Sequence, residues 1–160
     1  MTGGILAYGL LAALAIALLI AAFTDLRARR IDNWLTVGVA LGAPAFWFAS
    51  GLPLWPGVAL QLGFALAAFV VLAALFAIRA MGGGDVKLLT ALALWLPLTP
   101  FLKLLVMMAL VGGLLTILIA AWHRIRRAEG KVQIPYGVAI AGSGLWVLGT
   151  TYWPAGGQLG

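Results

Sequence analysis

Long apolar runs, separated by short polar or charged connections, fill most of this chain. The runs are rich in Leu, Ala, Ile and Val and do not alternate with polar positions, which indicates helices and not the strands of a barrel. At about 1.5 Å per residue, the first run is long enough to cross a bilayer core of about 30 Å. The fourth run is short, so we expect it to be tilted or shielded by its neighbours. The predicted helices cover residues 5–23, 34–49, 54–78, 86–98, 101–122 and 134–150.

The amino-acid composition indicates that these apolar runs belong to a membrane protein. Of the 160 residues, 64% are apolar and 9% charged, with a mean hydropathy of +1.13. The chain has too few polar side chains to cover the surface of a water-soluble domain. We therefore expect an all-α polytopic membrane protein with six transmembrane helices, forming one domain over residues 1–160. The absence of cysteine excludes disulfides and thiolate metal sites, and the single histidine, His123, lies in a basic run, so no metal or cofactor is expected.

The basic residues are concentrated in alternate connections. Residues 24–33, 79–87 and 123–133 hold nine of the ten Lys and Arg side chains, and the intervening connections hold only Lys103. By the positive-inside rule, the three basic connections face the cytoplasm and both termini lie outside it. Topology and anionic lipid headgroups explain the net charge of +6 better than nucleic acid does. No basic residue precedes the first run, which predicts a retained helix and not a cleaved signal peptide.

Two of the four acidic residues lie at the inner membrane edge. Asp25 ends the first helix and Asp85 begins the fourth, so folding can bring them together. Carboxylates are costly near hydrocarbon, and two adjoining ones tend to share a proton. Such a pair suits peptide hydrolysis, because the ionised member activates water and the protonated one polarises the carbonyl. The alternative is that these aspartates cap helices or pair with neighbouring arginines.

The other two acids are weaker candidates. Asp32 lies beside Arg29 and Arg30, so a solvated salt bridge or an N-cap for the second helix is favoured over catalysis. Asn33 is also a good N-cap by residue type. Glu129 lies in a basic connection and is expected to be solvated.

Three glycines, Gly82, Gly83 and Gly84, lead directly into Asp85. Glycine permits backbone conformations closed to other residues, so this run is predicted to let a substrate strand approach Asp85. The alternative is a plain flexible loop. Lys87 follows, either extending to the interface or contacting substrate. The helix dipole predicts Asp85 as the ionised base at a helix N-terminus and Asp25 as the protonated acid at a C-terminus, although the arginines near Asp25 oppose this order.

Three segments together resemble the type IV prepilin peptidase family. Gly82-x-Gly84-Asp85 resembles the GxGD signature of intramembrane aspartyl proteases, and the following Val-Lys-Leu-Leu is similar to its continuation in that family. Residues 25–36, which include Asn33, resemble the first aspartate motif, with Asp32 where the family usually has Pro. Pro135, Tyr136 and Gly137 resemble the start of the family's sixth span. The length is similar to that of the small tight-adherence (TadV/CpaA-like) members.

The resemblance implies an aspartic endopeptidase of the bacterial cytoplasmic membrane, with Asp25 and Asp85 as catalytic residues. Its substrate would be a prepilin-like membrane protein, cut on the cytoplasmic side between a short basic leader and a hydrophobic helix. Larger relatives also methylate the new N-terminus through a cysteine-bearing cytosolic segment, and this chain has no such segment. Two other functions stay open at this point: a small proton-coupled transporter, and a non-catalytic membrane scaffold.

Overall fold

Six α-helices make up the computed structural model, which describes residues 2–125 and 136–152. These described ranges contain no strand, so the all-α prediction is confirmed. A short turn, η1 (Leu54–Val58), leads into the third helix. The helices are α1 (Thr2–Ala28), α2 (Asn33–Ala49), α3 (Ala59–Ala77), α4 (Gly83–Trp95), α5 (Leu98–Ile125) and α6 (Tyr136–Tyr152).

Three of these segments are long and apolar enough to cross a membrane: Gly4–Ala28, Leu54–Ala77 and Leu98–Ile125. Most of their surface faces outward, as expected of helices in contact with lipid. The prediction of a helical membrane protein is confirmed. The other three helices are shorter, with 17 residues in α2, 13 in α4 and 17 in α6.

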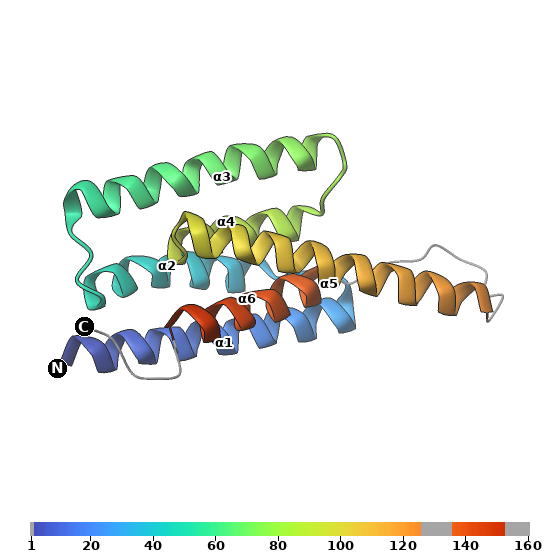
Figure 1. The fold of residues 1–160 in the computed structure, drawn as a ribbon, viewed down its shortest axis with the longest axis horizontal. Coiled ribbons are helices and arrows are strands. Elements are labelled where there is room, and N and C mark those ends of the chain that lie inside the picture. Colours follow the sequence, from blue (N-terminus) through green and yellow to red (C-terminus); the bar gives the residue numbers. More distant parts are fainter. Residues whose placement is uncertain (1, 126–135, 153–160) are drawn as a thin grey trace.

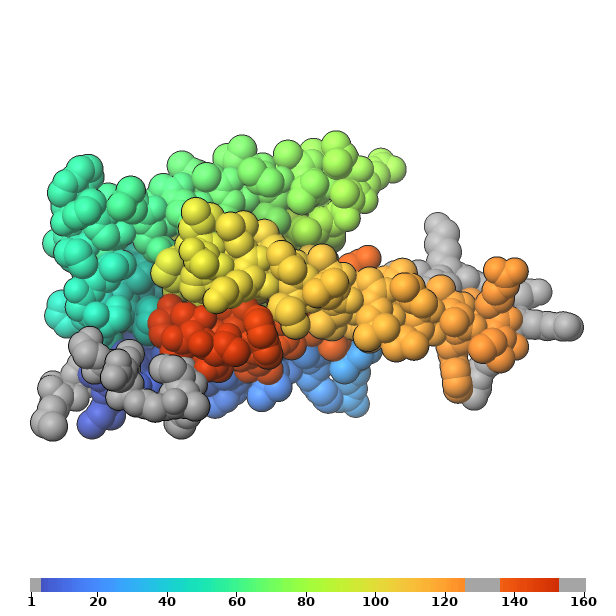
Figure 2. Space-filling view, in the orientation of Figure 1, coloured from blue at the N-terminus to red at the C-terminus, as the bar shows by residue number. Residues whose placement is uncertain are grey.

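The shortest helix, α4, lies at the centre of the bundle (Figure 1). It packs on α2 and α3, contacts α5 and α6, and buries most of its side chains from Val86 to Trp95. The short fourth apolar run predicted that this helix is either tilted or shielded by its neighbours, and the shielding is confirmed. On the face in Figure 2, α6 lies between α5 and α1, on both of which it packs closely.

Side chains from three other helices close the C-terminal end of α4. The last carbonyls of a helix have no partner within the helix, and hydrocarbon supplies no water to satisfy them. Trp47 Nε1 donates to the carbonyl of residue 94 at 2.8 Å, and Gln61 Nε2 donates to those of residues 93 and 96 at 2.7 and 3.0 Å. Tyr152 Oη donates to the carbonyl of residue 95 at 3.3 Å. These hydrogen bonds allow a helix of 13 residues to end inside the protein.

The basic connections that the structure describes meet at one end of the bundle. Successive helices run in opposite directions, so the α1–α2 and α3–α4 connections lie at the same end, beside the start of α6 (Figure 1). α1 and α3 both end there, and in the connection after each helix an arginine has left-handed backbone: Arg29 at φ 54° and Arg79 at φ 61°. The far end of α5 extends beyond the other helices (Figures 1 and 2). Which side of the membrane this end faces stays a prediction.

Candidate active site

Asp25 lies in the last turn of α1 and is almost completely buried, with 7% of its surface exposed. Its Oδ2 atom accepts a hydrogen bond of 2.9 Å from the backbone N–H of Gly137, 112 residues away in the first turn of α6. The contact is also tight sterically. A Cβ atom on Gly137 would lie 2.9 Å from the Cβ, Cγ and Oδ2 atoms of Asp25. The packing of α1 on α6 therefore fixes the position of this carboxyl group.

Asp85 lies in the first turn of α4 and is half-buried. Gly82 is the N-cap of this helix, and its backbone donates a hydrogen bond to the Asp85 carboxyl group. An acidic side chain that reaches back from the third helical position to the N-cap is the acidic half of a capping box. Asp85 thus has a structural role at the start of α4, while its carboxyl group stays accessible from the end of the bundle.

The two carboxyl groups line one cavity of about 740 Å³. The end of α1, the connection after it, the start of α4 and the start of α6 form its walls. The structure therefore brings together Asp25 and Asp85, which are sixty residues apart in the chain. The residues that line the cavity are Asp25, Ala28, Arg29, Arg30, Ile31, Gly82, Gly83, Gly84, Asp85 and Tyr136.

Asp85 precedes the apolar run of α4 and lies outside the three long spans. Its pKa is raised from 3.8 to about 6, first because burial removes water from the carboxylate and second because the negative charge of Asp25 is close. The hydrogen bond from Gly82 opposes this rise in pKa. Asp85 therefore keeps its proton to a higher pH than an unperturbed aspartate does. The helix dipole favours ionised Asp85, but the 0.3–1 kcal/mol or so expected from a dipole is outweighed by desolvation and by the neighbouring charge.

The glycine run forms the start of α4, with Gly82 as its N-cap. Gly83 and Gly84 are helical, and Gly82 has φ −72°, a conformation open to any residue. At two of the three positions, a steric clash with a neighbouring side chain accounts for glycine, and a special backbone conformation does not. A Cβ on Gly82 would lie 2.9 Å from Asp85 Oδ2, and one on Gly83 would lie 3.3 Å from the ring of Phe76, whereas one on Gly84 would make ordinary contact at 3.4 Å with Ile31. All three glycines line the cavity, as a substrate-facing backbone would.

The chain matches the family model for type IV leader peptidases over residues 12–121, more than half of its length. It belongs to the type IV leader peptidase family. Neither the curated proteins nor the solved structures gave a match. The part that matches the leader peptidase model contains Asp25 and Asp85 but ends before α6. The contact between α6 and Asp25 is therefore information that the structure adds.

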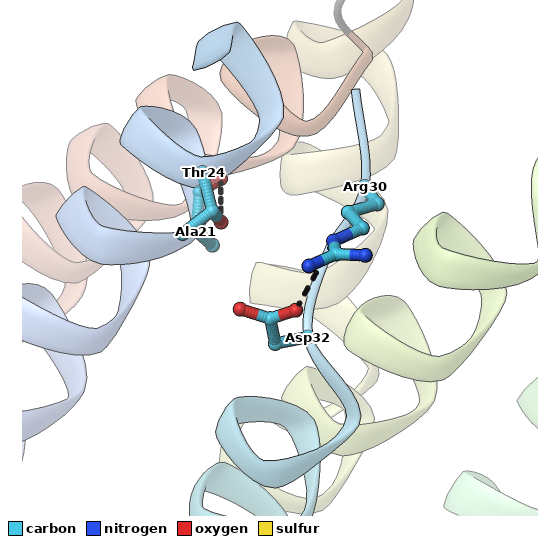
Figure 3. Close-up of polar contacts among 4 residues, drawn as sticks. All are labelled: Ala21, Thr24, Arg30 and Asp32. Carbon is cyan, nitrogen blue, oxygen red and sulfur yellow. Dashed lines mark hydrogen bonds and ion pairs between the residues drawn. The ribbon is translucent and has the colours of Figure 1, made fainter. Parts of the chain in front are cut away.

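Three other candidate positions lie outside the cavity of this leader peptidase. Lys87 is exposed and donates a hydrogen bond of 3.0 Å to Asn33 Oδ1, which ties the start of α4 to the start of α2. Asn33 is the first residue of α2, so the expectation that it caps the helix is wrong. Asp32 occupies the N-cap position without a side-chain capping bond, and forms an ion pair of 3.6 Å with Arg30 (Figure 3). The salt bridge predicted for Asp32 is confirmed.

Tyr136 lines both the cavity that contains Asp25 and Asp85 and a second cavity of about 850 Å³. The second cavity lies between α3 and α5, and also reaches Gly82 and Asp85. The sequence suggested Tyr136 and Gly137 only through resemblance, and nothing in their spacing indicated that Gly137 would contact Asp25. Pro135, the third residue of that motif, lies outside the described residues. Within the described ranges, no three side chains of the types that bind metals come together.

Proposed function

We propose that this leader peptidase is an aspartic endopeptidase in which Asp25 and Asp85 form the catalytic pair. The observation that carries the proposal is a single cavity at the basic end of the bundle, lined by both carboxyl groups, in which one group has a raised pKa. Two carboxyl groups whose environments favour different protonation states can act as base and acid in one reaction. The whole chain acts as one domain in the cytoplasmic membrane, with both termini outside the cytoplasm.

In the reaction, Asp25 is the ionised base and Asp85 the protonated acid. Asp25 takes a proton from a water molecule whose oxygen attacks the peptide carbonyl, while Asp85 gives its proton to the carbonyl oxygen. The product of this step is a tetrahedral diol. The C–N bond then breaks as Asp25 gives its new proton to the amine, and one diol hydroxyl returns a proton to Asp85. Both carboxyl groups finish in their starting states.

The substrate is a prepilin-like membrane protein, cut between its basic leader and its apolar helix. Arg29 and Arg30 line the cavity, and Arg79 lines the second one, so a basic leader is not attracted by charge. Anchoring by the substrate's own helix supplies the effective concentration instead. The glycines that line the cavity offer backbone along which an extended leader can lie.

The proposal is tested by coexpressing a prepilin-like reporter with four variants and following the size of the reporter. Asp25→Asn and Asp85→Asn should each leave the reporter uncut. Asp32→Asn is the matched control, because Asp32 does not line the cavity and is paired with the exposed Arg30. Lys87→Met tests the substrate-contact alternative and should also retain cleavage, since Lys87 contacts Asn33. Cleavage that survives both Asp25→Asn and Asp85→Asn would overturn the proposal, and its loss in Asp32→Asn alone would show that the first acid is wrongly chosen.

A further inference from the structure

We infer that the start of α6 is a third component of the active site, and that Gly137 is a positioning residue whose backbone N–H holds Asp25 as the ionised base. This inference rests on the proposed peptidase function. It adds a helix that lies beyond residues 12–121, the part that matches the family model.

The first argument is the direction of the hydrogen bond. The N–H groups in the first turn of a helix have no partner within the helix, and the helix dipole there is positive. In α6, the N–H of Gly137 is such a group, and it donates to Asp25 Oδ2 at 2.9 Å in a buried setting. A buried carboxyl group keeps its charge only when donors or positive charges favour the ionised form. The start of α6 supplies one such donor.

The second argument is the surroundings of Asp25. The charged and titratable groups that share its cavity are Asp85 on α4, Arg29 and Arg30 in the connection after α1, and Tyr136 on α6. The two arginines are exposed, and Arg30 is paired with Asp32. Gly137 is instead buried and lies in direct contact with the carboxyl group, so its effect on Asp25 is little weakened by solvent.

The third argument is that only glycine fits. A Cβ at position 137 would lie 2.9 Å from three atoms of Asp25, closer than real Cβ contacts occur. α6 cannot move away freely, because it is packed along both α1 and α5. Even alanine therefore has to displace the carboxyl group or break its hydrogen bond. The close approach brings the donor to the carboxylate and fixes the direction in which the carboxylate faces the cavity.

The matched test replaces three glycines of α6 by alanine. Gly142→Ala is the neutral control, because a Cβ there meets nothing within 4 Å. Gly144→Ala is the packing control, because its Cβ would lie 2.9 Å from a methyl group of Leu18, away from the cavity. Each purified variant is assayed for reporter cleavage from pH 4 to 9 and for thermal unfolding in detergent.

Gly137→Ala should lower kcat/KM by about 100-fold, since a misplacement of about 1 Å in a catalytic group costs about this much. It should also move the acidic limb of the pH–rate profile to higher pH, because the base loses a donor that favours its charge. Gly142→Ala should match the wild type. Gly144→Ala should lower the unfolding temperature without moving either limb. A folded Gly137→Ala that cleaves as Gly142→Ala does, or that loses rate with an unmoved profile, would overturn the inference.

A second measurement does not depend on the folding of Gly137→Ala. In protein labelled with 15N-glycine, the Gly137 amide proton should resonate downfield and should move upfield in Asp25→Asn, whose neutral amide is a weaker acceptor. An unchanged resonance would contradict the inference. The two proposals fail separately. Active Asp25→Asn and Asp85→Asn variants would overturn the peptidase mechanism, whereas inactive aspartate variants beside a fully active Gly137→Ala would overturn only the role of α6.

Discussion

Asp85 is expected to make the folded protein less stable at neutral pH, so replacing it should stabilise the fold while ending cleavage. Its pKa is about 6 in the folded protein, against 3.8 for an unperturbed aspartate. Between these two values, the folded state binds a proton that the unfolded state has released, so stability falls as pH rises. Below 3.8 both states are protonated, and above about 6 the penalty is complete.

The size of the penalty follows from the shift in pKa. A rise from 3.8 to about 6 corresponds to at most about 3 kcal/mol, at about 1.36 kcal/mol per pH unit. Asp85 is only half-buried, and solvent screens its charge, so we expect about 1–2 kcal/mol. Asp85→Asn keeps the shape and an acceptor oxygen for the bond from Gly82, and removes the charge. For a protein of this size, the gain corresponds to an increase of about 2–8 °C in unfolding temperature above pH 6.

The assay is thermal unfolding in detergent micelles, followed by the fluorescence of the seven tryptophans. Wild type and Asp85→Asn are compared at several values from pH 3.5 to 8. The difference in unfolding temperature should be near zero at the lowest pH and should grow to its full size by pH 7. Asp32→Asn serves as the control, because its aspartate is paired with Arg30 on the surface. A difference that is independent of pH, or an Asp85→Asn variant less stable than the wild type at pH 8, would refute the reasoning.

Three further predictions follow from the same structure. The kcat/KM for reporter cleavage should fall as pH rises through about 6, because Asp85 has to be protonated to act as the acid; a profile flat from pH 5 to 8 would contradict this. Gly82→Ala should reduce cleavage strongly, because its Cβ would lie 2.9 Å from Asp85 Oδ2, whereas Gly142→Ala, whose Cβ meets nothing within 4 Å, should match the wild type in the same assay. Gln61→Leu leaves two carbonyls at the end of α4 without a donor and should destabilise the fold by about 1–3 kcal/mol in thermal unfolding, with the pH–rate profile unchanged.

The apolar pattern predicted the number and order of the helices, because each run is long enough to form one and no other pattern competes. It predicted the ends less well, because polar residues can continue a helix. α1 extends through Asp25 to Ala28 instead of ending near Phe23, and α5 begins at Leu98 with Pro100 in its first turn. Proline is tolerated there, since the first N–H groups of a helix have no partner to lose.

The candidate site could be predicted in part for a similar reason. Acids are rare in this chain, and Asp25 and Asp85 lie at helix ends on the same side, so their meeting followed from topology. The raised pKa of Asp85 did not follow, because it depends on burial and on the charge of a neighbour that is distant in the chain. The role of Gly137 was also hidden. A glycine 112 residues from Asp25 has no local signal, and only the packing of α6 on α1 brings it to the carboxyl group.

The position of Asp85 is set at both ends of α4, which explains how a helix of 13 residues can hold a carboxyl group in a fixed place. At the C-terminal end, donors from α2, α3 and α6 hold the carbonyls of residues 93–96. At the N-terminal end, Gly82 binds the Asp85 carboxyl group itself, and Lys87 ties the first turns to α2. α6 contacts both parts of the site: Tyr152 donates to a carbonyl at the C-terminal end of α4, and Gly137 donates to the carboxyl group of Asp25. A change at the far end of α4 should therefore affect stability first, and should affect catalysis only when it lets α4 move relative to α6.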